Sequence, residues 1–158
     1  MNLSSEAKLE LVHPILADKI RRMAEILSLD PQPIELIVSA GARSWAEQDH
    51  LWQQGRITPG DIVTDARGGE SWHNFGLAVD CAPEVVEGTI DWNASHPQWK
   101  RMEQVGINLG LTSGATWKRI VDAPHFEYTN PYPPAKPTAE ARRIYSQQGT
   151  AAFWATII

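Results

Sequence analysis

The most informative segment of the chain reads Ser71-Trp72-His73-Asn74-Phe75-Gly76-Leu77-Ala78-Val79-Asp80. Residues 76–82 are small and apolar apart from Asp80, which predicts a buried strand. The Asn74-Phe75-Gly76 sequence is typical of a turn, and this turn would fold His73 back toward Asp80. A carboxylate is costly to bury unpaired. A metal ligand, or else a structural salt bridge, therefore explains Asp80 better than packing does.

A second polar segment, Asp122-Ala123-Pro124-His125-Phe126-Glu127, lies downstream. A catalytic zinc ion typically takes three protein ligands and keeps a fourth position for water. His73, Asp80 and His125 could supply these three ligands if the strand that carries His125 pairs beside the strand that carries Asp80. Two neutral imidazoles and one carboxylate leave a net positive charge, which lowers the pKa of bound water from 15.7 to roughly 7.

A hydrolase of this type also needs a base, and Asp122 is our candidate. Its position three residues before His125 requires a bend, which Pro124 favours. Asp122 could instead orient a ligand histidine. Glu127 competes for the role of base, since strand alternation permits it to share a face with His125.

Around these motifs, helical and strand periodicities alternate without a regular βαβ rhythm. The expected elements are one long or two short helices within 5–27, a strand at 34–40, a helix at 45–54 capped by Ser44 with Glu47 in a capping box, a loop at 56–70, a helix from about 97 to 109, short strands at 118–121 and 125–128, and a helix from Thr138 to about Gln148. This order predicts an α+β fold with a small, mainly antiparallel sheet flanked by helices, and a zinc site at the sheet.

The length of 158 residues fits a single domain, 1–158. We expect a core of about 11–128, with a C-terminal helix and apolar tail, 138–158, docked on it.

The composition excludes several classes of function. The net charge is −5 without a basic run, so the electrostatic footprint of a nucleic-acid-binding protein is missing. The single cysteine, Cys81, excludes an intrachain disulfide and is expected to pack in the core. No segment reaches the length of a membrane span, and residues 1–10 carry charges where a secretory signal has its apolar core. We expect a monomer that has no signal peptide and does not insert stably into membranes.

The motifs resemble those of the zinc D-alanyl-D-alanine carboxypeptidase and L-alanyl-D-glutamate endopeptidase family, which includes many phage endolysins. The resemblance lies in an S-x-H-x-x-G-x-A-x-D segment, a D-x-P-H-F segment and an upstream G-x-R-S-x-x-E-Q segment, and it extends in consistent order over about 11–128. It implies that His73, Asp80 and His125 hold one Zn²⁺ ion and that Asp122 is the general base.

The same resemblance assigns Arg43 to the scissile carbonyl, where its rigid, charged fork would stabilise the oxyanion. The alternative for Arg43 is a structural pair with a carboxylate such as Glu47. Ser71 is expected to help position substrate, and Trp72 and Trp117 could line a cleft. Some relatives carry glutamate where this chain has Asp122, and the shorter side chain favours the endopeptidase branch.

The expected substrate is therefore the stem peptide of bacterial peptidoglycan, cut at the L-alanyl-D-glutamate bond. One alternative is a D-alanyl-D-alanine carboxypeptidase with the same site. Another is a non-catalytic wall-binding module that keeps zinc for stability. Since the substrate lies outside the cytoplasmic membrane, the simplest expectation is a phage endolysin that stays in the cytoplasm until a holin releases it.

Overall fold

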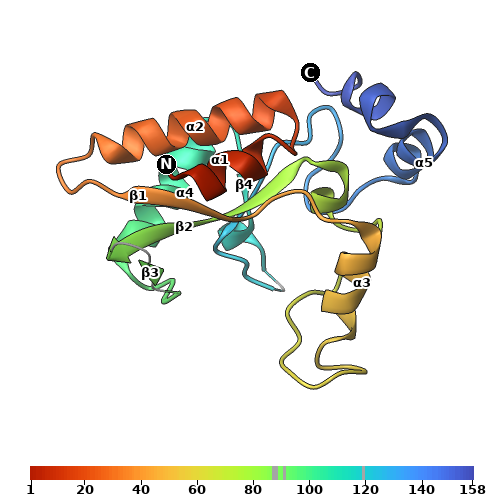
Figure 1. The fold of residues 1–158 in the computed structure, drawn as a ribbon, viewed down its shortest axis with the longest axis horizontal. Helices are drawn as coiled ribbons and strands as arrows, with labels where there is room; N and C mark the ends of the chain where they lie inside the picture. Colours follow the sequence, from red (N-terminus) through yellow and green to blue (C-terminus); the bar gives the residue numbers. More distant parts are fainter. Residues whose placement is uncertain (87–88, 91, 119) are drawn as a thin grey trace.

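Helices cover one face of a five-stranded sheet in the computed structural model of this chain (Figure 1). The structure describes residues 1–86, 89–90, 92–118 and 120–158. The helices are α1 (Leu3–Leu9), α2 (Pro14–Ser28), α3 (Trp45–Gln53), α4 (Pro97–Asn108) and α5 (Ala139–Trp154), with short 3₁₀ helices η1 (Trp72–Phe75) and η2 (Gly114–Thr116). The strands are β1 (Glu35–Ala40), β2 (Ala78–Val86), β3 (Thr89–Ile90), β4 (Thr112–Ser113) and β5 (His125–Glu127). This single small domain is the α+β fold that we expected.

Strand β2 is central to the sheet. The order is β1-β2-β5-β4, with β3 paired to β2, and every pairing is antiparallel. Asp80 of β2 lies opposite His125 of β5, and opposite Ala40 of β1 just after a register shift. Because side chains alternate between the faces of a strand, this register places Asp80 and His125 next to each other on one face of the sheet.

The other face packs against the helices α1, α2 and α4. Val79 and Cys81 of β2 and Phe126 of β5 are fully buried there, as the core role predicted for Cys81 requires. Gly106 of α4 lies so close to the Phe126 ring that a Cβ atom at this position would overlap it. A close-packed core of this kind holds the strands, and with them the opposite face, in place.

The chain's last helix packs on a second, aromatic cluster around η1. Phe153 is buried against Phe75 and Trp72, and the Trp154 Nε1 donates a hydrogen bond of 2.8 Å to the carbonyl of Phe75. The helix expected from Thr138 to about Gln148 is present and breaks at Gly149, whose φ and ψ are not helical; a second helical segment, which was not expected, continues α5 to Trp154.

One expectation is corrected by the structure. None of the described residues of the strand expected at 118–121 lies in a strand: Lys118, Ile120 and Val121 are outside the strands, and residue 119 is outside the described residues. Ile120 and Val121 are exposed, so their apolar side chains have no core to face, and β4 supplies the outer strand instead.

Near the N-terminus the chain forms two helices, the second of the two arrangements that we expected, since the proline that opens α2 interrupts the helical pattern. Among the described residues, no helix is long and apolar enough to cross a membrane.

Candidate metal centre

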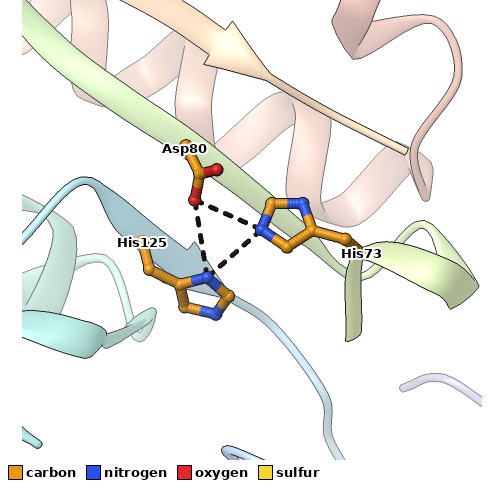
Figure 2. A group of neighbouring side chains, drawn as sticks. All are labelled: His73, Asp80 and His125. Atoms are coloured by element: carbon orange, nitrogen blue, oxygen red, sulfur yellow. Dashed lines mark hydrogen bonds and ion pairs between the residues drawn. The ribbon is translucent and has the colours of Figure 1, made fainter. Parts of the chain in front are cut away.

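Three side chains from distant parts of the chain converge on one point (Figure 2). His73 Nε2 lies 3.2 Å from Asp80 Oδ1 and 3.2 Å from His125 Nδ1, and the latter two atoms are 3.5 Å apart. A tetrahedral zinc ion with bonds of about 2.0–2.1 Å separates its ligand atoms by roughly 3.3 Å. The three atoms therefore already have the spacing of a zinc ligand set.

Local structure accounts for how each of these side chains is placed. His73 lies on η1, whose N-cap residue Ser71 accepts a hydrogen bond from the His73 amide. Gly76 ends this helix with a φ of 67°, a left-handed conformation that glycine adopts without a Cβ clash, and the chain then enters β2. The expected turn before Asp80 is thus one turn of 3₁₀ helix, and the strand register supplies His125.

The protonation of the two rings fits a metal ion. His73 Nδ1 lies 2.8 Å from the carbonyl oxygen of Gly41, which can only accept, so Nδ1 carries the proton. His125 Nε2 likewise lies 2.9 Å from a carboxylate oxygen of Glu127. Both inward nitrogens then present lone pairs to each other and to Asp80. Three lone pairs at this spacing are favourable only with a proton or a metal ion among them, and the donor set suits zinc.

The electrostatics of the cluster point the same way. Burial opposes ionisation of Asp80, yet His73 and His125 hold the pKa of this carboxyl far below its usual range. Burial opposes charge on His125 as well, but hydrogen bonds with Asp80 and Glu127 raise the pKa of His125 to about 9. The site is therefore a place where positive charge is favoured.

Asp122 lies beside this cluster, with Oδ2 4.0 Å from His125 Nδ1. The bend expected before His125 is present, because the His125 amide donates to the Asp122 carbonyl at 3.1 Å. Gly114 permits this turn, since a Cβ atom there would lie 2.6 Å from the Asp122 carbonyl oxygen. Burial and the neighbouring Asp80 raise the pKa of Asp122. A carboxylate at the edge of the cluster is what a base requires.

Glu127, the competing candidate, occupies a different position. It shares the face of His125, as alternation allows, but its carboxylate contacts the outward Nε2 of that ring. Its second oxygen accepts a hydrogen bond from the Ala135 amide. Glu127 is therefore placed to orient His125, the role that the sequence had suggested as an alternative for Asp122.

Arg43 points toward the cluster. Its Nη2 lies 3.5 Å from Asp80 Oδ2, and its Nη1 donates a hydrogen bond of 2.9 Å to Gln48 Oε1. The carboxylate of Glu47 is instead engaged in the capping box with Ser44, as the motif predicted. The structure thus pairs the Arg43 guanidinium with Asp80 and Gln48 at the mouth of the site.

Two buried amides that sequence reasoning did not single out hold this arginine. Gln48 is 1% exposed and also donates to the carbonyl of Ala66. Asn74 donates to the carbonyl of Arg43 and accepts from the amide of Gly69. Gln48 follows Glu47 in the upstream motif, and Asn74 follows His73. Its place as a polar, uncharged residue of that motif is the signal that could have identified Gln48, whereas Asn74 occupies an unspecified position of its own motif and carries no such signal.

A cavity of about 330 Å³ opens above the cluster and is bordered by Arg43, Ser71, Trp117 and Asp122. The Trp117 ring lies tilted against the His125 ring, with 4.8 Å between ring centroids and 46° between their planes. Trp72 also borders the cavity but is only 1% exposed, because its ring belongs to the aromatic cluster under η1. We therefore expect Trp72 to support the cavity floor, whereas Trp117 offers a ring surface.

The cavity adjoins two open grooves. One, beside α3, has a volume of about 500 Å³ and shares Arg43 and Leu51 with the cavity. The other has a volume of about 600 Å³ and shares Thr64, Trp117 and Asp122. The space above the cluster thus connects with a groove at each of these two sets of residues.

Comparisons with known proteins agree with this geometry. A family model described as D-alanyl-D-alanine carboxypeptidase matches residues 64–128. The peptidoglycan L-alanyl-D-glutamate endopeptidase CwlK of Bacillus subtilis (strain 168) is 38% identical over 126 residues, which cover 73% of this chain and 72% of that protein. The crystal structure of the L-Ala D-Glu endopeptidase ChiX of Serratia marcescens matches with a TM-score of 0.57 and 26% identity, covering 82% of this chain and 89% of the other. The chain therefore belongs to peptidase family M15, the zinc-dependent family that its motifs resemble.

Proposed function

We propose that this chain hydrolyses the L-alanyl-D-glutamate bond of the peptidoglycan stem peptide and uses a single zinc ion for this reaction. The convergence of His73 Nε2, Asp80 Oδ1 and His125 Nδ1 within a two-sided cleft is the observation that carries the proposal. Two relatives with names that specify this bond support it.

His73, Asp80 and His125 would hold the zinc ion. When bound, the ion supplies a Lewis acid and makes hydroxide accessible near neutral pH. The three ligands contribute one negative charge, so the centre keeps a net positive charge. The bonds of His73 Nδ1 to Gly41 and of His125 Nε2 to Glu127 hold a proton on each outward nitrogen, so the inward nitrogens are the ones that would bind the ion.

We assign the proton transfers to Asp122 and the stabilisation of the developing negative charge to Arg43. Asp122 takes the proton of the attacking water and returns it to the leaving amine, a role for which a raised pKa suits a carboxylate. Arg43 donates to the carbonyl oxygen as it becomes an oxyanion, and Gln48 holds one of its nitrogens while this happens. Ser71, at the border of the cavity, helps to position the peptide.

The cleft favours an endopeptidase over a carboxypeptidase. A bond within a peptide needs space on both sides of the reacting carbonyl, and grooves extend both toward α3 and toward Trp117. A carboxypeptidase needs space for only one residue on the leaving side. The name of the matching family model keeps D-alanyl-D-alanine carboxypeptidase as the second candidate.

Mass spectrometry of purified stem peptides tests the proposal. Cleavage at the proposed bond releases L-alanine from the amino end of the stem, whereas a carboxypeptidase releases the terminal D-alanine. Asp122→Asn should leave both substrates intact. Release of D-alanine alone by the wild-type protein would contradict the endopeptidase proposal and indicate a D-alanyl-D-alanine carboxypeptidase.

We further propose that the protein acts as a phage endolysin, most simply as a monomer that a holin releases to the cell wall. Lysis of outer-membrane-stripped bacteria, followed as loss of turbidity, tests this role. His73→Ala is the control, because it removes a proposed ligand. Equal clearing by both proteins would contradict the mechanism.

A further inference from the structure

Glu127 is the most buried carboxylate among the residues that the structure describes, with 1% of its surface exposed. A buried carboxylate is costly unless hydrogen bonds compensate its charge. Glu127 has two such bonds, one from each oxygen: Oε2 lies 2.9 Å from His125 Nε2, and Oε1 accepts from the amide of Ala135. The first partner carries the proposed metal ligand atom, and the second belongs to the wall of the cleft.

Both partners of Glu127 must be donors. The amide of Ala135 has a proton and no lone pair to offer, so it requires an acceptor. His125 can present Nδ1 to the zinc position only when its proton is on Nε2, and that proton also requires an acceptor. Only a carboxylate offers an acceptor to each side. A glutamine would turn an NH₂ group toward one of the two donors.

Ala135 is held in an unusual conformation. Its φ is 71°, in the left-handed region that residues with a Cβ adopt only at a cost. Ala135 borders the central cavity, and the next residue, Lys136, forms an ion pair of 3.1 Å with Glu70 on the opposite segment of the cleft. The hydrogen bond that the Ala135 amide donates to Glu127 thus fixes a strained point of the cleft wall.

We propose that Glu127 is a positioning residue that couples zinc binding to the wall of the cleft at Ala135. One carboxylate keeps His125 in the tautomer that binds the ion and keeps Ala135 in its left-handed conformation. Because coupling between two sites is reciprocal, an ion at His125 stabilises the wall, and an ordered wall strengthens ion binding. This inference rests on the proposed zinc centre but not on turnover.

Zinc affinity measured by competition with a chromophoric chelator tests the first half. Glu127→Gln should weaken zinc binding by about 10–100-fold, the range for loss of a group that orients a ligand. Glu25→Gln is the matched control: it changes a glutamate that pairs with Arg22 at an exposed position on α2, away from the cleft, and it should bind zinc as the wild type does. Wild-type affinity in a folded Glu127→Gln protein would overturn the proposal.

NMR of the wild-type protein tests the second half and needs no variant. In the zinc-loaded protein, the ¹⁵N shifts of His125 should report a proton on Nε2 and none on Nδ1, and zinc should slow hydrogen exchange of the Ala135 amide at least about fivefold. A proton on Nδ1 of the zinc-loaded protein, or exchange that zinc leaves unchanged, would refute the coupling even if Glu127→Gln does not fold. These readouts do not depend on peptide cleavage, so a zinc-loaded protein without peptidase activity would contradict the proposed function alone.

Discussion

The two faces of strands β2 and β5 come from alternate residues of the same short segments, yet they are built on different principles. On the helix-covered face, Val79 and Phe126 are fully buried among apolar side chains. On the other face, Asp80 and His125 bring together polar atoms whose lone pairs converge (Figure 2). The core face is stabilised by the area that it removes from water, whereas the site face gathers polar atoms at a spacing that suits a cation.

This difference separates stability from chemistry within a few residues. A change on the core face should alter the free energy of unfolding and leave the geometry of the cluster intact. A change on the site face should remove activity while the core stays folded. The predictions below test this separation in order of their expected effect on activity.

Removal of the metal ion should have the largest effect. Treatment with a chelator should reduce stem-peptide cleavage to background, and added zinc should restore it, because three lone-pair ligands without an ion have no catalytic role. Circular dichroism should still report folded helices, since α2 and α4 pack on the opposite face. Full activity at zinc levels below one ion in a hundred chains, by elemental analysis, would contradict the site.

Substitution of the proposed base comes next. Asp122→Asn should lower kcat about 10²–10⁴-fold, the usual contribution of general base catalysis, with zinc content unchanged. Because burial and Asp80 raise the pKa of Asp122, wild-type activity should decline toward acidic pH above the usual titration range of an aspartate, as the base takes up its proton. An unchanged kcat in the variant would exclude Asp122 from this role.

Loss of the Arg43 guanidinium at the mouth of the site should lower kcat somewhat less than loss of the base. Arg43→Ala should lower kcat about 10²–10³-fold, as for the loss of one oxyanion donor. Arg43→Lys should recover only part of this, since an ammonium lacks the planar fork that contacts Gln48 and Asp80. Arg22→Ala, at an exposed position on α2, serves as the control. Equal kcat values for all three would indicate a purely structural Arg43.

The smallest effect on activity is expected for a substitution on the core face. Val79→Ala removes buried methyl groups directly beside Asp80 and should reduce the free energy of unfolding by about 1.5–3 kcal/mol. The kcat of the folded protein should stay that of the wild type, when measured well below the unfolding temperature. A large loss of kcat with intact stability would mean that the two faces are not separable.

The regular parts of the fold were predictable because their patterns are local. The capping box of Ser44 and Glu47 and the periodicity of α2 and α4 depend on neighbours within one or two turns. The strand expected at 118–121 was wrong for its described residues, because β-branched side chains such as Ile120 and Val121 do not report whether a sheet edge is available to pair with. The extension of α5 beyond Gln148 was missed since the aromatic cluster that holds Phe153 forms only in the folded chain.

The sequence by itself grouped His73, Asp80 and His125 as one ligand set and Asp122 as its neighbour, because residue type, motif spacing and strand alternation are properties of short segments. Only the tertiary structure decided the partners of these residues. Whether Glu127 faces the zinc position or the outer nitrogen of His125, and which amide lies against its second oxygen, depends on how the Ala135 segment packs beside β5. Such contacts join residues through space, and the periodicity of a single strand carries no information about them.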